Sequence, residues 1–155
     1  MKIWDAIIIG AGIIGLSLAI ELRKRGMTVL VVEKGESGRE ASWAAGGMLA
    51  DFPLEMPPAL HELAHASAQM YPEFVHQLED ESRLKIDLRA QGTILFLDSD
   101  QHGQVQSMHP LPAPLAELEP AIVPCVGKTP PRVAYLSERS VDPRGLVTAA
   151  IAAAV

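Results

Sequence analysis

The sequence predicts an α/β fold that begins with a strand–helix–strand unit, and three consecutive stretches carry this prediction. The first, "DAIIIG" at residues 5–10, is short, continuous and rich in Ile, which is typical of a strand buried on both faces of a parallel sheet. The second, "IIGLSLAIELRKRG" at 13–26, has the apolar spacing of a helix. The third, "TVLVVEK" at 28–34, is a second buried strand. A unit of this kind within about thirty residues is the building block of parallel sheets.

The end of the predicted helix has the expected chemistry. Arg23, Lys24 and Arg25 occupy its last turn, where positive charge is favoured by the negative end of the helix dipole. Gly26 follows, and glycine leaves a helix readily in the left-handed conformation.

A glycine-rich turn links the first strand to the helix with the pattern G-x-G-x-x-G. Gly10 permits a tight turn, Gly12 lets the backbone approach a pyrophosphate, and Gly15 lets the helix pack closely on the strands. The amides of Ile13 and Ile14 would point at the phosphates, with the positive end of the helix dipole behind them.

An acidic residue completes the pattern at the end of the second strand. Glu33 lies about 20 residues beyond the turn, where a carboxylate accepts hydrogen bonds from an adenosine ribose and repels a 2′-phosphate. The turn and Glu33 together predict that an ADP-type dinucleotide binds here. FAD and NAD both satisfy this pattern.

The segment "GESGREASWAAGGMLADFP" at residues 35–53 favours FAD. A nicotinamide domain would normally continue through a second amphipathic helix into a third buried strand. Here the residues are mostly Gly, Ala and Ser around one large aromatic, Trp43. Small side chains let the backbone lie against a flat ligand and offer N–H groups to it. A short Ala-rich helix without ligand contact is the alternative reading.

Residues 51–139 predict part of an antiparallel α+β substrate domain inserted into the nucleotide-binding domain. The apolar spacing of residues 57–82 indicates one long helix, or two that are broken near Pro72. The remaining expectations are two extended runs around residues 90–92, a short helix in 113–122, a strand in 132–138 and a Pro-rich surface loop over 109–131.

The final stretch, "VDPRGLVTAAIAAAV", predicts a helix with Asp142 at its N-cap and Pro143 at its first position. We expect residues 140–155 to return to the nucleotide-binding domain that residues 1–50 begin. Two buried parallel strands leave the sheet incomplete. A C-terminal half or a partner chain is therefore expected to complete it, the chain being a truncated product, a cleavage fragment or one part of a split polypeptide.

A zinc site is the competing interpretation of "HELAH". On a helix, His61 and His65 would share one face and could bind zinc, with Glu62 as general base. Only Glu79 and Glu81 are candidates for a third ligand, and only by their distance along the chain. We predict no metal.

Composition narrows the classes of partner. The net charge of −6, without a Lys/Arg cluster, argues against nucleic acid and against an anionic membrane. The apolar N-terminal stretch contains Asp5 and is followed by "ELRKR", so it is not predicted to be a signal peptide or a membrane span. The single cysteine, Cys125, is interpreted as a packed thiol and fits a reducing, cytoplasmic compartment.

The segments "DAIIIGAGIIGLSLAIELRKRGMTVLVVEKG", "GREASWAAGGMLA" and "SVDPRGLVTAAIAAA" together resemble the glycine oxidase branch of the D-amino acid oxidase-type flavoenzymes. The resemblance implies a Rossmann-like FAD-binding unit. It also implies an oxidase that removes a hydride from the α-carbon of a small amino acid or amine. The flavin then passes the electrons to O₂, giving H₂O₂ and an imine that water hydrolyses.

The resemblance also implies cofactor-binding residues for FAD. These are Gly10, Gly12, Ile13, Ile14, Gly15, Glu33, Lys34, Ala41, Ser42, Gly46, Gly47 and Met48. Arg39 is either a phosphate contact or a solvated charge. No catalytic residue is assigned, because in the family the substrate-binding Arg and Tyr belong to the second half. An NAD-dependent dehydrogenase fragment and a non-catalytic nucleotide-binding module that assembles with a partner chain are the alternatives.

Overall fold

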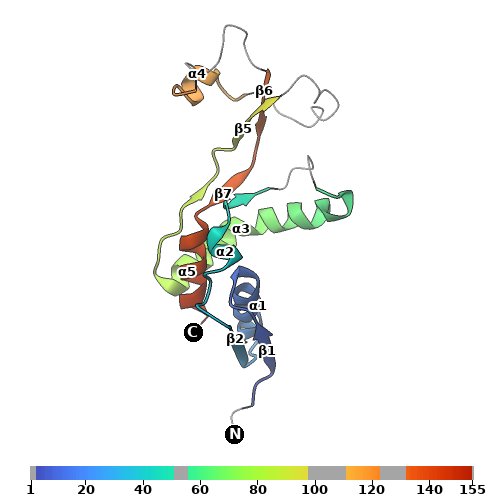
Figure 1. Cartoon of the computed structure of the whole chain (residues 1–155), viewed down its shortest axis with the longest axis vertical. Coiled ribbons are helices and arrows are strands. Elements are labelled where there is room, and N and C mark those ends of the chain that lie inside the picture. The colour runs from blue at the N-terminus through green and yellow to red at the C-terminus, as the bar shows by residue number, and fades with distance from the viewer. Residues whose placement is uncertain (1–2, 51–55, 98–110, 123–131, 155) are drawn as a thin grey trace. The chain divides into compact units, whose positions relative to one another are not determined.

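The structure of the protein is a computed structural model that describes residues 3–50, 56–97, 111–122 and 132–154. Helices and strands are mixed along the chain, as predicted for an α/β fold (Figure 1). The chain divides into two compact units, the first formed by 1–48, 69–88 and 141–155, and the second by 49–68 and 89–140.

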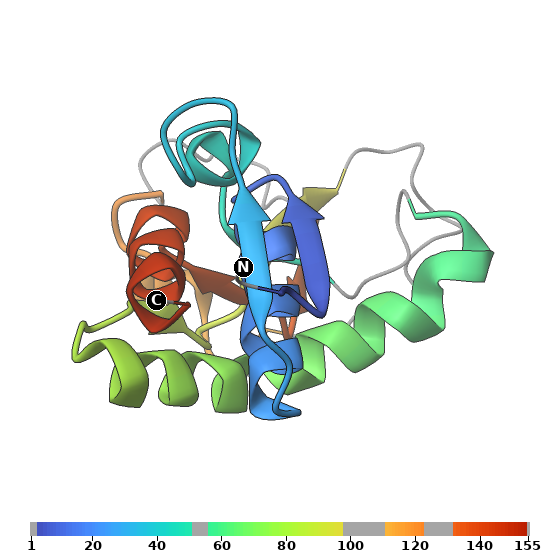
Figure 2. The same cartoon turned by 90° about the horizontal axis from the view of Figure 1, so that it is seen from below.

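The first unit contains the predicted strand–helix–strand. Strands β1 (Ala6–Ile9) and β2 (Val29–Val32) are parallel, with Ala6 opposite Val29 and Ile9 opposite Val32. Helix α1 (Ile13–Lys24) connects them and covers one face of the pair, so that Figure 2 views both strands from the face without the helix.

The core of the first unit lies between helices. Helix α1 packs against α5 (Pro143–Ala153), and the second half of α3 (His61–Ser82) adds further apolar side chains. The buried side chains of these three helices in this unit are Leu16, Ala19, Ile20, Val75, Leu78, Leu146, Val147, Ala149, Ala150 and Ala153. Alanine on α5 allows close approach of a neighbouring helix, because its side chain occupies little volume.

The N-terminus of α5 has the predicted cap. The carboxylate of Asp142 accepts hydrogen bonds from the backbone N–H groups of Arg144, at 3.0 Å, and Gly145, at 3.1 Å. Pro143 occupies the first turn, where its missing N–H leaves no hydrogen bond unmade. The predicted helix in this part of the sequence is therefore confirmed.

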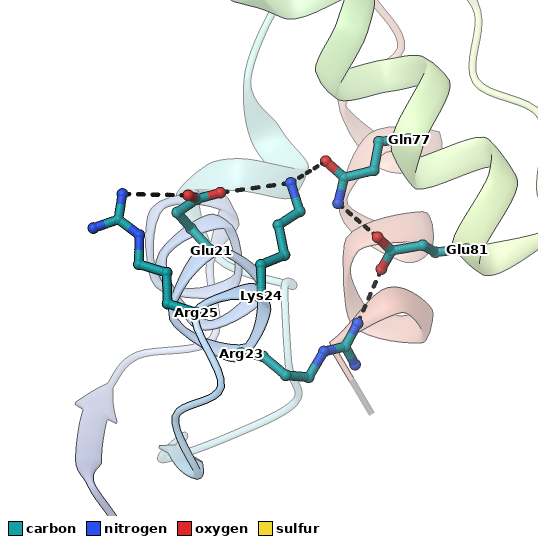
Figure 3. Close-up of polar contacts among 6 residues, drawn as sticks. All are labelled: Glu21, Arg23, Lys24, Arg25, Gln77 and Glu81. Atoms are coloured by element: carbon teal, nitrogen blue, oxygen red, sulfur yellow. Dashed lines mark hydrogen bonds and ion pairs between the residues drawn. The ribbon is translucent and has the colours of Figure 1, made fainter.

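Polar contacts join the C-terminal turn of α1 to α3 (Figure 3). Arg23 Nη2 lies 2.9 Å from Glu81 Oε2, and Lys24 donates a hydrogen bond to Gln77. Gln77 in turn donates to Glu81 at 2.6 Å. Because these side chains are partly exposed, each pair adds well under about 1 kcal/mol, and their main effect is to fix how the two helices align.

Helix α3 settles an alternative that the sequence left open. It is one continuous helix with Pro72 inside it, not two helices. Pro72 has no N–H for the carbonyl oxygen of Ala68, one turn earlier, and the Arg139 side chain donates to that oxygen at 3.3 Å. Val75 and Leu78, in the turns after Pro72, are buried.

The second unit contains an antiparallel strand pair. Strand β5 (Thr93–Leu97) pairs with β6 (Arg132–Leu136), with Thr93 opposite Leu136. At the start of β5, Gly92 has φ +81°, and a Cβ there would lie 2.3 Å from Tyr135 Oη. Only glycine accommodates both the backbone conformation and the aromatic ring lying over it.

The remaining elements are short. They are the 3₁₀ turn η1 (Pro58–Leu60), α2 (Ala41–Ala44), α4 (Leu115–Leu118) and the strands β3 (Met48–Leu49), β4 (Leu88–Arg89) and β7 (Arg139–Val141), which pair in the order β3-β7-β4. The extended runs, the short helix and the strand expected in residues 88–136 are thus present. Cys125 and the remainder of the Pro-rich stretch beyond 111–122 lie outside the described residues.

Candidate functional site

The glycine-rich turn has the geometry that its residues predict. Gly10 has φ +105° and its N–H donates to Val32 O at 2.8 Å, which fixes the turn at the ends of both strands. A Cβ on Gly15 would lie 2.0 Å from Gly10 O, so only glycine lets the helix start this close to the strand. Gly12 is the N-cap of α1 and has no side chain to cap it.

Two side chains from elsewhere in the first unit reach the amides of this turn. Glu33 Oε2 accepts from the N–H of Ala11 at 2.8 Å, and Ser42 Oγ accepts from the N–H of Ile13 at 3.0 Å. Ser42 also lies so close to Gly12 that a Cβ there would approach its Oγ to 3.0 Å. Residues 33 and 42, both predicted cofactor contacts, therefore converge on the predicted phosphate turn.

Glu33 is held by backbone N–H groups at both carboxylate oxygens. Its Oε1 accepts from Lys34 at 2.7 Å and from Gly35 at 3.2 Å, in addition to the bond from Ala11 to Oε2. The Ala11 hydrogen bond, followed by that from Gly35, lowers the pKa of Glu33 below its ordinary value. The ionised carboxylate offers about four acceptor positions, so Oε2 retains one that a ribose hydroxyl could use.

The N-terminus of α1 fits a diphosphate. The first N–H groups of a helix have no acceptor within the helix, and the helix dipole favours an anion there. Ser42 Oγ occupies the N–H of Ile13, and its hydroxyl hydrogen can donate to a phosphate oxygen. The donors and the acidic side chain present here are thus those that an ADP-type group requires.

Residues 35–47 form an irregular segment in which the short helix α2 is the one regular element, as the small residues predict, and β3 begins at Met48. Gly38 has φ +76°, and a Cβ there would lie 2.1 Å from Val147 Cγ1 of α5. Gly47 has φ +75°, and a Cβ there would lie 2.0 Å from Val141 O. The Val141 N–H donates to Gly47 O at 2.9 Å, so α5 and the last residue of β7 support this segment at Gly38 and at Gly47.

Four other predicted cofactor contacts lie at exposed positions: Lys34, Ala41, Gly46 and Met48. Lys34 pairs with Glu40 at 3.7 Å, with both side chains exposed. Ala41 is exposed, Gly46 has open space where a Cβ would be, and the Met48 side chain is 65% exposed. These positions form an accessible surface on the segment.

Trp43 has partners that the sequence did not reveal. The guanidinium carbon of Arg39 lies 3.8 Å from the centre of its ring, and that of Arg144 lies 5.3 Å away. Arg39 also forms an ion pair with Glu36 at 2.7 Å. Arg144 is far from Trp43 in the sequence. Its place in the first turn of α5 did not indicate a contact with Trp43.

The first histidine of "HELAH" lies close to a backbone carbonyl. His61 Nε2 lies 3.0 Å from the carbonyl oxygen of Met56. Within the described ranges, no three His, Cys, Asp or Glu side chains are grouped so that they could hold a metal ion. In the same part of the chain, no helix is both long enough and apolar enough to cross a membrane.

Comparisons with known proteins point to one family. The family model for FAD dependent oxidoreductases matches residues 5–155. The glycine oxidase of Pseudomonas aeruginosa is 38% identical over an alignment of 137 residues, and the match covers 84% of this chain and 37% of that protein. The glycine oxidase of Bacillus licheniformis is 40% identical over 109 residues, covering 68% of this chain and 29% of that protein.

A solved structure shows the same fold. The crystal structure of glycine oxidase from Geobacillus kaustophilus superposes with a TM-score of 0.77 at 24% identity, covering 97% of this chain and 44% of that one. The chain therefore spans well under half the length of the relatives it matches. The FAD dependence of the matched family confirms the predicted cofactor, and an NAD enzyme is not favoured. A match over residues 5–155, a shared fold and a dinucleotide-type turn lead to one conclusion: the chain belongs to the FAD dependent oxidoreductase family.

Proposed function

We propose that this chain is the FAD-binding portion of a flavin-dependent oxidase of the glycine oxidase type. Residues 1–50 and 140–155 would form a Rossmann-like FAD-binding unit, and residues 51–139 part of an inserted substrate domain. The observation that supports this most is the convergence of Glu33 and Ser42 on the amides of Ala11 and Ile13.

Each predicted contact has a part in holding FAD. The turn, with Gly10, Gly12, Ile13, Ile14 and Gly15, would lie against the pyrophosphate, because the dipole of α1 favours an anion there. The N–H groups of Gly10 and Ile13 already donate to Val32 O and Ser42 Oγ, so the phosphate would take other donors of the turn and the Ser42 hydroxyl. Glu33 Oε2 would accept a hydrogen bond from a ribose hydroxyl, with Lys34 beside it.

The irregular segment would contact the rest of the cofactor. Ala41 and Ser42 would lie against the phosphates, and the backbone of Gly46, Gly47 and Met48 would lie along the flavin. The exposed side chain of Met48 and the open space at Gly46 leave room for a flat ring.

FAD, when bound, supplies the acceptor for the two electrons of amine oxidation. The α-carbon of a small amino acid loses a hydride and its nitrogen loses a proton, which leaves an imine. Water hydrolyses the imine, and O₂ is reduced to H₂O₂. The described residues would bind and orient the cofactor for this reaction, and no catalytic residue is assigned among them.

The bare face of the β1–β2 pair supports a further part of the proposal. The side chains of Ile7 and Ile9 are 63% and 89% exposed, although their sequence is that of a strand buried on both faces. We propose that a C-terminal part of the oxidase, or a partner chain, covers this face and contributes the substrate-binding residues. A cytoplasmic location stays a prediction from the sequence.

Titration of the chain with FAD tests the cofactor proposal. Quenching of flavin fluorescence should give saturable binding, and NADH should not compete. Glu33→Gln should weaken FAD binding about tenfold, because a charged acceptor of the ribose is lost. Glu73→Gln removes an exposed carboxylate on α3, away from the proposed site, and is the matched control, expected to bind as the original chain does. Equal affinities of Glu33→Gln and Glu73→Gln, or preferential binding of NADH, would contradict the proposal.

A second experiment tests the reaction. The chain would be mixed with the C-terminal part of a related glycine oxidase, and H₂O₂ measured with glycine, sarcosine and D-alanine. H₂O₂ should appear only when both polypeptides and FAD are present. If this chain produced H₂O₂ without the second polypeptide, the substrate-binding residues would have to lie in this chain, which contradicts the proposal.

A further inference from the structure

Trp43 is held between its own segment and a distant helix. Arg39, in the same segment, lies 3.8 Å from the ring centre, and Arg144, on α5, lies 5.3 Å from it. Both distances fall within the roughly 6 Å over which a guanidinium is attracted to an aromatic face. Arg144 is far from Trp43 in the sequence, so its contact ties Trp43 to a distant helix.

The side chain of Arg144 is available for this contact because its backbone alone makes the helix cap. Asp142 accepts from the backbone N–H groups of Arg144 and Gly145, and these bonds do not depend on the side chain at residue 144. The cap therefore fixes where the Arg144 side chain leaves the helix. Replacing that side chain removes the contact with Trp43 and keeps the cap.

Trp43 is adjacent to the residue that caps α1. It lies in α2, which at four residues is too short to be stable by itself and depends on external contacts. Ser42, the preceding residue, accepts the hydrogen bond from the Ile13 N–H at 3.0 Å. A contact that holds Trp43 thus also holds Ser42 at the start of α1.

Two further contacts bring α5 and the last residue of β7 to the same segment. Gly38 packs on Val147, and Gly47 O accepts the hydrogen bond from the Val141 N–H. These contacts lie on either side of α2, and α2 itself packs against α5. The Arg144–Trp43 contact lies between them in the sequence.

The geometry points to Arg144 as a positioning residue for the cofactor turn. By contacting Trp43 it fixes α2, and α2 places Ser42 at the N–H of Ile13. The consequence for FAD rests on the proposed function, whereas the placement of Ser42 does not. Helix α5 would in this way take part in cofactor binding through Trp43.

Hydrogen exchange of the Ile13 amide, measured by NMR on the chain without FAD, tests the placement directly. Arg144→Ala should make this amide exchange about two- to fivefold faster, the size expected for one partly exposed cation–π contact. Arg144→Lys should give an intermediate rate, because it keeps the charge and loses the planar group. Arg25→Ala, which removes an exposed arginine paired with Glu21, is the matched control and should leave the rate unchanged.

A double-mutant cycle separates this contact from a general loss of stability. In a Trp43→Leu chain, Arg144→Ala should have no additional effect on Ile13 exchange. In a Trp4→Phe chain, where Trp43 is the remaining tryptophan, Arg144→Ala should increase quenching of its fluorescence by acrylamide. The inference is overturned if Arg144→Ala behaves as Arg25→Ala does, or if its effect is the same with and without Trp43.

Titration with FAD then separates this inference from the proposed function. Arg144→Ala should bind FAD about two- to fivefold more weakly than the original chain, and Arg144→Lys should lie between them. If the original chain does not bind FAD but Ile13 exchange still responds to Arg144→Ala, the proposed function fails and the placement of Ser42 stands. If the original chain binds FAD and Ile13 exchange does not respond, the placement fails and the proposed function stands.

Discussion

The two faces of the β1–β2 pair differ, although the strands have one continuous apolar sequence. On one face, Ile8 is 9% exposed and lies against the start of α1, where a Cβ on Gly15 would approach its Cγ2 to 3.3 Å. On the other, Ile7 and Ile9 are 63% and 89% exposed. Alternation along a strand places these side chains on opposite faces.

This difference separates the face of the strand pair that the chain covers with its own helix from the face that it leaves exposed. Composition alone predicts that both faces are buried, because Ile is equally apolar at residues 7, 8 and 9. The covered face is stabilised by the chain itself. The bare face is the surface for which we propose a further part of the oxidase or a partner chain.

The covered face depends most on close approach of helix and strand, so Gly15→Ala should have the largest effect. The new Cβ would lie 2.0 Å from Gly10 O, a backbone atom that cannot move without opening the turn. We expect a loss of about 3 kcal/mol in the free energy of unfolding, measured by urea denaturation. Gly35→Ala, with nothing within 4 Å of its Cβ, is the control and should change stability by less than about 0.5 kcal/mol. Equal stabilities of the two variants would show that the helix does not approach the strand as described.

Ile8→Ala should have the next largest effect. It removes the side chain that β1 buries toward α1 and leaves a cavity, with an expected loss of about 2 kcal/mol in a urea or thermal denaturation experiment. Ile8→Val, which removes one methylene, should lose about 1 kcal/mol. A loss below about 0.5 kcal/mol for Ile8→Ala would mean that α1 does not cover this face.

The local elements of the first unit could be predicted because each has its own signal in the sequence. Apolar runs specify β1 and β2, the glycine spacing specifies the turn, and Asp142 before Pro143 specifies the start of α5. The order of Glu33 after β2 also placed it near the turn, since parallel strands end at the same edge of a sheet. These are short-range relations that a chain expresses without tertiary contacts.

Contacts between distant segments had no such signal. The hydrogen bond from Ile13 to Ser42 and the contact of Arg144 with Trp43 depend on how α2 packs beside α5. Pro72 illustrates the same limit. Local propensity allowed a break, whereas in the structure the helix is continuous and the Ala68 carbonyl, which Pro72 leaves without a helix N–H, accepts from the distant Arg139. Whether Ile7 and Ile9 would be covered could not be decided from their apolar character either.

Glu33 lies at the carboxyl end of β2, beyond both faces, and should have a smaller effect that depends on pH. Its pKa is lower in the folded chain, mainly through the Ala11 hydrogen bond, so the unfolded chain binds more protons as the solution becomes acidic. The stability that it contributes is present above the unfolded carboxyl pKa, roughly pH 4.3, and is lost as pH falls through the folded pKa.

Denaturation of Glu33→Gln across the acid range checks this dependence. The variant should be less stable than the original chain near pH 7, and the difference should shrink toward pH 3. Glu40→Gln removes only an exposed ion pair and should keep the acid dependence of the original chain. A difference between Glu33→Gln and the original chain that stays constant with pH would show that the carboxylate is not held by the Ala11 amide.

Ile9→Ser should have the smallest effect on stability and is the sharpest comparison with Ile8→Ala. Its side chain is 89% exposed, so its replacement should change the free energy of unfolding of this chain by less than about 0.5 kcal/mol. The same substitution should weaken H₂O₂ production when the chain is mixed with the C-terminal part of a related oxidase, because the proposed covering segment would lose an apolar contact. Thr148→Ser, on an exposed position of α5, is the control and should affect neither measurement. If Ile9→Ser destabilises the chain as much as Ile8→Ala does, both faces are already covered within this chain, and no further part of the protein is needed to explain its apolar strands.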